Sequence, residues 1–194
     1  MGDELLGPGD DWRLNACVDY GADKWDLYAS GYRTAAELLT SHVRERGVDQ
    51  DRLIYPVVFL WRHHLELLIK SIIKVTSSLL DRRGASVEGH ELSQLFGTAR
   101  QLLGEFSVTE RDALPPGTAQ RTREALRKFN SVDATSQVFR YPVDKQAHEH
   151  LTGVRHINFQ VVEDYMRSVS DALGELLIAL DMVDQWRLDQ LGDC

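Results

Sequence analysis

The sequence contains only two cysteines, Cys17 and Cys194, which lie far apart and have no Cys-x-x-Cys or Cys/His spacing around them. A disulfide framework needs several paired cysteines, and a structural zinc site needs clustered Cys and His ligands, so the sequence argues against both. Isolated, reduced cysteines fit the cytoplasm best. We therefore expect a cytoplasmic protein.

Positive charge and long hydrophobic runs are also scarce. The chain has 22 Lys and Arg residues against 30 Asp and Glu, a formal net charge of −8, so nucleic-acid binding would require a local basic patch. The longest apolar run, Leu53–Trp61, is far shorter than the roughly 20 residues of a membrane span. The acidic residues 1–11 lack the basic region of a signal peptide. We expect a soluble protein with no membrane partner.

The motifs of common cofactor and metal enzymes are missing as well. The chain has no GxGxxG, GxxxxGKS, HExxH or GxSxG sequence. His148 and His150 flank Glu149, but no further ligand follows at a helical spacing. We expect neither a cofactor nor a bound metal.

Strand signals are few, whereas apolar residues recur at spacings of three and four through most of the chain, which indicates α-helices. With 194 residues, 43% of them apolar, the chain can bury one core. We predict an all-α bundle of four to five main helices, forming a single domain over residues 1–194 with a loose lead-in at 1–10. The predicted helices cover residues 24–46, 51–81, 89–105, 118–130 and a long C-terminal segment from about 158, with a loop at 133–142.

The predicted C-terminal helix carries a heptad seam. Its apolar residues alternate at spacings of three and four: Phe159, Val162, Met166, Val169, Leu173, Leu176, Leu180 and Val183. Such a seam can pack against a partner helix, so we expect a homodimer, formed through this helix or through faces that it supports. A long central helix of a monomeric bundle would show the same pattern.

A narrow polar stripe runs along the predicted helix 51–81, which is otherwise apolar around most of its circumference. Arg62, Glu66 and Lys70 share one face at spacings of four, with His63 beside them. A carboxylate between two cations orients both, and the histidine can titrate near neutral pH. The group could therefore grip a phosphate or act as a general acid and base. A solvated ladder of ion pairs is the alternative.

His90 lies where helix 89–105 is predicted to begin, at the positive end of the helix dipole, which favours a neutral imidazole. It could move a proton, or it could only cap or pack the helix. In the segment Phe139-Arg140-Tyr141-Pro142, we expect Arg140 and Tyr141 to point inward, where the guanidinium could pair with a carboxylate such as Glu66 or bind phosphate. A surface loop is the alternative for this segment.

Residues 121–145 form a basic patch in an acidic protein. Its basic residues outnumber its acidic residues by six to three. The basic residues are Arg121, Arg123, Arg127, Lys128, Arg140 and Lys145, and the acidic ones are Glu124, Asp133 and Asp144. We expect Arg123 and Arg127, both on the predicted helix 118–130, to contribute phosphate contacts. A solvated helix face would produce the same composition.

Three segments in this order resemble the HEPN superfamily of small helical bundles: Arg62-His63-x-x-Glu66-x-x-x-Lys70, Gly89-His90-x-Leu92-x-x-Leu95 and Phe139-Arg140-Tyr141-Pro142. The resemblance spans about residues 50–185. It implies a commonly dimeric bundle, of the kind found in bacterial ribonuclease toxins, in phage-defence proteins and in members that bind RNA or nucleotides without cutting. The ribonuclease members carry Arg-x(4–6)-His near the last helix, whereas this chain has that spacing once, from Arg83 to His90.

The sequence therefore favours a HEPN-like protein of a bacterial defence or toxin-type system, with a protein partner from that system, that binds or cleaves RNA or binds nucleotide phosphate. In a metal-independent cleavage, His63 or His90 would move protons and Arg62 or Arg140 would stabilise the charged phosphate. Glu66 would orient this group, and the substrate-binding residues would be Lys70, Tyr141, Arg123 and Arg127. The alternative is a non-catalytic dimerising or adaptor module, whose polar stripe would be buried and mutually hydrogen-bonded instead of lining an open cleft.

Overall fold

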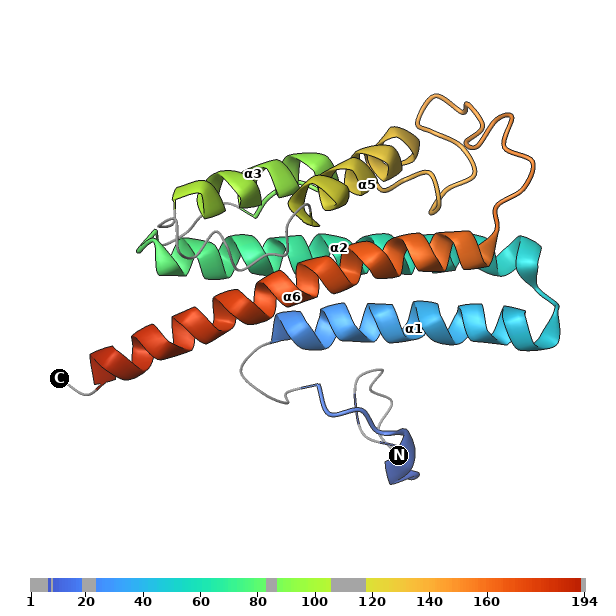
Figure 1. The fold of residues 1–194 in the computed structure, drawn as a ribbon. Coiled ribbons are helices and arrows are strands. Elements are labelled where there is room, and N and C mark those ends of the chain that lie inside the picture. Colours follow the sequence, from blue (N-terminus) through green and yellow to red (C-terminus); the bar gives the residue numbers. More distant parts are fainter. Residues whose placement is uncertain (1–6, 8, 19–23, 83–86, 106–117, 193–194) are drawn as a thin grey trace.

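The computed structural model describes residues 7, 9–18, 24–82, 87–105 and 118–192 (Figure 1). These residues form one short 3-10 helix and five α-helices: η1 (Trp12–Leu14), α1 (Lys24–Arg46), α2 (Gln50–Leu79), α3 (Leu92–Glu105), α5 (Thr118–Val132) and α6 (Phe159–Gly192). Within the same ranges there is no strand, and one isolated antiparallel bridge joins Val143 to Glu149. The predicted all-α class is confirmed. Arg83, Gly84 and the predicted break at residues 115–117 lie outside the described residues.

The central helix of the bundle is α2. It packs against α1, α3 and α6, and Figure 1 shows α1 on one side of it, α3 and α5 on the other, and α6 crossing its length. Its apolar residues form the middle of the core: Val57, Trp61, Leu65, Ile69, Ile72 and Ile73 are all at most 1% exposed. A helix that is apolar around most of its circumference is buried on most sides, as the sequence indicates.

The connection between α1 and α2 is a tight turn. Gly47 has a φ of 65°, and its N–H donates to the carbonyl of Val43 at 2.9 Å, which is a common way to end a helix. Helix α2 then starts at Gln50 and continues through Pro56. The bounds predicted for the first helix agree with those of α1, and α2 ends two residues before its predicted end.

The heptad seam of α6 packs inside the chain's own core. Its central residues, Met166, Val169, Leu173, Leu176 and Leu180, are buried in the cluster that α2 dominates. The seam therefore packs as expected for a central helix of one bundle, which is the alternative to a dimer interface. A separate row on α6, made of Ile178, Met182 and Trp186, is more than 60% exposed.

Helix α3 begins at Leu92, three residues later than predicted. Gly89 has a φ of 88°, a left-handed conformation that no α-helix contains. The N–H of Leu95 donates to the carbonyl of Glu91 at 3.0 Å, so Glu91 is the first residue whose carbonyl enters the helix. His90 therefore lies just before the helix and not in its first turn.

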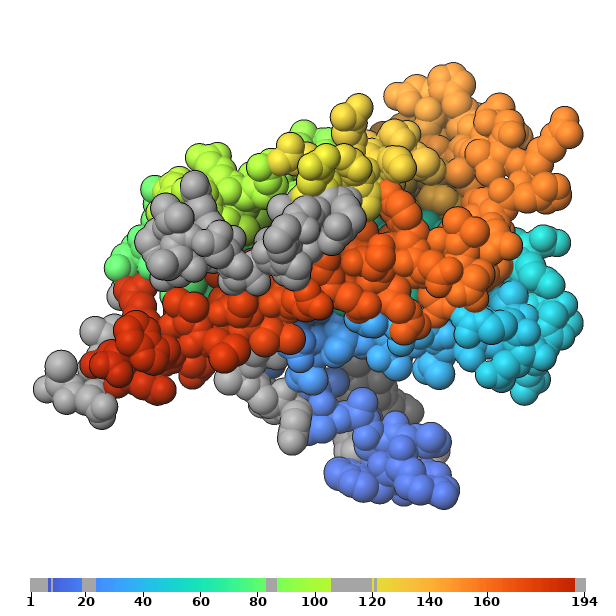
Figure 2. All heavy atoms as spheres, in the orientation of Figure 1, coloured from blue at the N-terminus to red at the C-terminus, as the bar shows by residue number. Residues whose placement is uncertain are grey.

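The segment between α5 and α6 forms a block of side chains at one end of the molecule, coloured tan to orange in Figure 2. A small second core holds it, because Phe139 packs with Ile54 and Val58 of α2. Phe139 is 7% exposed, whereas the next two residues, Arg140 and Tyr141, are exposed. The expectation that Arg140 and Tyr141 point inward is therefore wrong, since Phe139 takes the inward position.

Candidate functional site

The polar stripe of α2 meets the residues that precede α3. Glu66 Oε1 accepts hydrogen bonds from Lys70 Nζ at 2.9 Å and from His90 Nδ1 at 2.8 Å. Glu66 Oε2 lies 3.1 Å from Arg62 Nη1. The structure therefore brings four of the predicted site residues into one hydrogen-bonded group, which we call the Glu66 network.

The members of the Glu66 network differ in exposure. The side chain of Arg62 is 0% exposed and that of Glu66 2%, whereas Lys70 is 12% and His90 70% exposed. A buried ion pair is tolerated only when further hydrogen bonds compensate the loss of water, as they do here. A direct contact of Arg62 with phosphate does not fit this burial. Arg62 and Glu66 are buried, Lys70 is mostly covered, and His90 is the exposed member of the network.

Arg62 also holds two neighbouring segments in place. Its Nε lies 3.4 Å from the carbonyl oxygen of Asp133 and 3.6 Å from the Asp133 carboxylate, and its Nη2 donates to the carbonyl of His90. Asp133 is 2% exposed, and its Oδ1 accepts the N–H of Gln137 at 2.9 Å. The site thus includes Asp133, to which the sequence analysis gives no role. An Asp directly after a helix, followed by turn residues, is the pattern that could have indicated it.

The protonation state of Glu66 follows from these contacts. Burial alone would raise the pKa of its carboxyl group, but the hydrogen bonds from Lys70 and His90 outweigh burial and hold the pKa below its ordinary value. An ionised carboxylate can only accept hydrogen bonds, so Nδ1 of His90 carries a proton. Nε2 of His90 is then available to a ligand.

His63 lies beside this network in an aromatic setting. Its ring stacks on Phe59, with centroids 5.9 Å apart and planes at 6°, and meets the edge of Tyr32 at 4.4 Å. Burial is the main cause that lowers the pKa of His63 below its ordinary value. His63 is therefore a neutral imidazole at neutral pH, which is the state in which it can accept a proton.

Arg140 contacts the same Phe59 ring as His63. Its guanidinium carbon lies 5.5 Å from the Phe59 ring centroid and 5.3 Å from that of Tyr141, and its Nη2 is 3.3 Å from the Tyr141 hydroxyl. The partners of Glu66 among the described residues do not include Arg140. Phe59 thus contacts both the Arg140 guanidinium and the His63 imidazole. Phe59 is a second residue that the sequence analysis misses, because it reads there as part of an apolar run.

The basic residues of α5 form a separate surface. Arg123, Arg127 and Lys128 are exposed, and α5 packs against α3 and α6 through its other side. The side chain of Arg121 lies outside the described residues. Arg123 and Arg127 are therefore available to a polyanion, but they are not members of the Glu66 network.

On the opposite side of α2, His64 ties three helices together. Its Nδ1 lies 2.8 Å from the carbonyl of Ala29 in α1, and its Nε2 lies 2.7 Å from the hydroxyl of Ser170 in α6. The same hydroxyl accepts a hydrogen bond from Arg33 at 3.0 Å. Burial lowers the pKa of His64 to about 4, so its ring is neutral at physiological pH. Both ring nitrogens of this buried histidine are therefore satisfied by hydrogen bonds.

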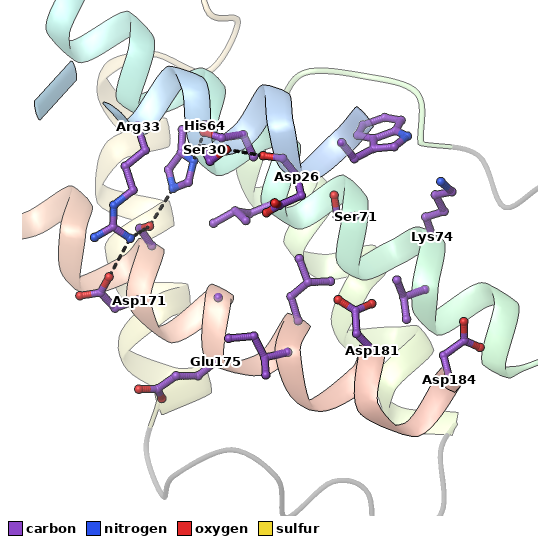
Figure 3. A pocket seen from close by; sticks show the side chains of 18 of the residues that line it. Asp26, Ser30, Arg33, His64, Ser71, Lys74, Asp171, Glu175, Asp181 and Asp184 are labelled. Atoms are coloured by element: carbon purple, nitrogen blue, oxygen red, sulfur yellow. Dashed lines mark hydrogen bonds and ion pairs between the residues drawn. The ribbon is translucent and has the colours of Figure 1, made fainter. Parts of the chain in front are cut away.

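A cavity of about 710 Å³ opens next to His64 between α1, α2 and α6 (Figure 3). Its lining includes five carboxylates and two cations. The carboxylates are those of Asp26, Asp171, Glu175, Asp181 and Asp184, and the cations are Arg33 and Lys74. Figure 3 shows the acidic side chains following α6 along one wall. This excess of negative charge disfavours the phosphates of a nucleic acid.

Metal sites and known relatives give no further identification. In the described ranges, no group of three or more His, Cys, Asp or Glu residues could hold a metal ion. None of the described helices is both long and apolar enough to cross a membrane. No protein-family model, no curated protein and no solved structure matches the chain. The resemblance to the HEPN superfamily therefore rests on the three sequence segments alone.

Proposed function

We propose that the chain is a HEPN-like, cytoplasmic protein of a bacterial defence or toxin-type system that binds and cleaves single-stranded RNA beside His63 and His90. The exposed imidazole of His90 carries the proposal. It is held at Nδ1 by the buried carboxylate of Glu66 and is 70% exposed. A carboxylate that fixes one ring nitrogen and leaves the other to a ligand is the arrangement that general acid–base catalysis uses.

The distribution of charge supports this side of the molecule as the RNA-binding side. Lys70 and Arg140 flank the two histidines, and Arg123 and Arg127 lie exposed on α5. The cavity beside His64, in contrast, is lined by an excess of carboxylates. Phosphate groups would therefore be attracted to the Glu66 network and repelled from the opposite side of α2.

The chemistry that these groups can perform is transesterification. A neutral histidine, His63 or His90, takes the proton of a ribose 2′-hydroxyl, the 2′-oxygen forms a bond to phosphorus, and the bond from phosphorus to the 5′-oxygen breaks. The other histidine, in its protonated form, donates a proton to the leaving 5′-oxygen. The products are a 2′,3′-cyclic phosphate and a 5′-hydroxyl. Lys70 and Arg140 would stabilise the charge on the phosphate oxygens.

A non-catalytic adaptor is the second candidate, and the burial of Arg62 and Glu66 favours it. A buried and mutually hydrogen-bonded group is what a structural network requires. In that case the Glu66 network only fixes α3 and the end of α5 against α2. The exposure of His90 distinguishes the two candidates, because a structural role gives no reason to leave its imidazole in solvent.

We further propose that the chain forms a homodimer and binds a protein partner of the same system. The exposed row of Ile178, Met182 and Trp186 on α6 supports the dimer, since three large apolar residues at spacings of four form a continuous stripe. The heptad seam is no longer an argument for it, because the structure uses that seam in the core.

Binding of a fluorescent single-stranded RNA of about 12 nucleotides tests the RNA-binding part of the proposal. We expect the His63→Ala and His90→Ala variants to bind at least about threefold more weakly, because each loses contacts at the phosphate. His156→Ala, which changes an exposed histidine elsewhere, is the matched control. Growth arrest on expression of the wild type, relieved in His63→Ala, would support activity in cells. Equal affinity of all four proteins for RNA would favour the adaptor.

A further inference from the structure

A second cavity lies next to Arg140, within the segment between α5 and α6. It has a volume of about 420 Å³, within the range of small-molecule pockets. Its lining includes Tyr55 from α2, residues 138–143 and residues 149–151. The bridge between Val143 and Glu149 and the turn held by Asp144, whose Oδ1 accepts the N–H of His148 at 2.9 Å, give its outer wall a defined shape.

One polar atom of this cavity is without a partner. Nε2 of His150 is buried from solvent and finds no hydrogen-bond partner among the described residues. A buried polar atom of this kind costs free energy unless something outside the chain satisfies it. His150 lines the cavity, and a rotation of its enclosed ring would bring Nε2 to a bound molecule that carries a hydrogen-bonding group.

The remaining lining specifies the kind of molecule. Tyr55 and Tyr141 are 46% and 50% exposed and contribute aromatic side chains to the lining. One cation, Arg140, and one anion, Glu149, line the cavity, so its charge is balanced and it favours a neutral ring over a phosphate. Glu149 can only accept hydrogen bonds, which favours a ring that carries an amino group.

We propose that this cavity binds the base of one nucleotide of the RNA, with preference for a base that carries an exocyclic amino group. Tyr55 and Tyr141 stack on the base, and His150 and Glu149 bind its edge. The phosphate of the same nucleotide lies on Arg140, whose guanidinium contacts the same Phe59 ring as His63. This inference rests on the proposed function, because it assigns the base next to the phosphate that the histidines would act on.

Equilibrium binding of adenosine monophosphate, uridine monophosphate and ribose 5-phosphate tests the base pocket. We expect the adenine nucleotide to bind at least about tenfold more tightly than ribose 5-phosphate, which lacks the stacking ring. It should also bind a few-fold more tightly than the uridine nucleotide, which lacks an amino group. Tyr141→Ala and His150→Phe should each weaken the binding of adenosine monophosphate by about tenfold. Tyr28→Ala, an exposed tyrosine on α1, should not.

Equal affinities for adenosine monophosphate and ribose 5-phosphate would overturn the base pocket. So would unchanged adenosine monophosphate affinity in both Tyr141→Ala and His150→Phe. Thermal unfolding of each variant shows whether it is folded, and Tyr55→Leu offers a second test at a half-exposed position. RNA binding that depends on His90 but not on Tyr141 or His150 would refute the pocket and leave the proposed function standing. Mononucleotide binding at the pocket without any binding of RNA would refute the proposed function and leave the pocket standing.

Discussion

Glu66 Oε1 lies 2.8 Å from His90 Nδ1, although the two residues are 24 positions apart in the chain. The contact joins a buried carboxylate in the middle of α2 to an exposed imidazole just before α3. It depends on Gly89, whose left-handed conformation keeps His90 out of the helix, and on Arg62, which binds the carbonyl of His90. The position of the exposed His90 imidazole thus depends on the buried charges of Arg62 and Glu66.

Removal of the Glu66 carboxylate should destabilise the protein strongly. Glu66→Ala leaves the guanidinium of Arg62 buried without its main charge partner, so we expect a loss of about 3–5 kcal/mol in the free energy of unfolding. The double variant Arg62→Met with Glu66→Leu should lose less than Glu66→Ala, because no guanidinium stays buried without Glu66, although the buried Asp133 carboxylate then loses its contact with Arg62. Chemical denaturation measures the free energy of unfolding of both variants. Glu124→Ala, at an exposed position, is the control and should lie within about 0.5 kcal/mol of the wild type. A loss below about 1 kcal/mol in Glu66→Ala would contradict the importance of this ion pair.

The stability of the protein should fall in mild acid because of His64. Its pKa is about 4 in the folded chain against an ordinary value of 6.5, so the unfolded chain binds more protons below pH 6.5. The contribution of neutral His64 to the free energy of unfolding is complete above about pH 6.5 and is lost as the pH falls toward 4. Between pH 7 and pH 5 we expect the free energy of unfolding to drop by about 2 kcal/mol through this residue.

The His64 contribution is measured by comparison with variants at both pH values. His64→Gln should lack that part of the drop, whereas the exposed His156→Gln should show the full wild-type dependence. The same pH dependence in His64→Gln and in the wild type would assign the acid sensitivity to other groups.

The basic surface of α5 should contribute to RNA affinity without reading sequence. Arg123→Glu combined with Arg127→Glu should weaken binding of every single-stranded RNA alike and flatten its salt dependence, because fewer counterions are released. The double variant Arg46→Glu with Arg100→Glu changes the same charge at other exposed positions and is the control. Unchanged affinity and salt slope in the α5 variant would leave the adaptor as the better account.

The oligomeric state should depend on the exposed row of α6. We expect a mass of about twice 22.0 kDa by light scattering at micromolar concentration. Ile178→Glu with Met182→Glu should reduce it to that of one chain, because a charge in the apolar stripe opposes its burial. Val161→Glu, at an equally exposed position of α6, is the control. A wild-type mass of one chain would contradict the dimer.

The sequence predicts the helices well because their signals are local. Apolar spacing and Gly47 place the bounds of α1, and the apolar circumference of α2 places it at the centre of the bundle. The start of α3 is predicted three residues early, since the left-handed conformation of Gly89 depends on the tertiary contact made by His90. Helical signals alone do not reveal such a contact.

The site is predicted in part, and its failures have a common cause. The spacing of Arg62, Glu66 and Lys70 shows that they share a face but not that the face is covered. Asp133 and the carbonyl of His90 cover it, and both come from distant segments of the chain. Arg140 and Tyr141 are exposed because Phe139 occupies the small second core, a competition between neighbours that only packing decides.

Cleavage of a single-stranded RNA by the purified protein, in the presence of a metal chelator, tests the central claim most directly. The account predicts fragments ending in a 2′,3′-cyclic phosphate and a 5′-hydroxyl. It also predicts a rate lower by roughly 100-fold or more in His63→Ala and in His90→Ala, because each histidine carries one proton transfer. His156→Ala should cleave at the wild-type rate. RNA that stays intact with the wild-type protein, or cleavage that survives both the His63 and the His90 substitutions, would contradict it.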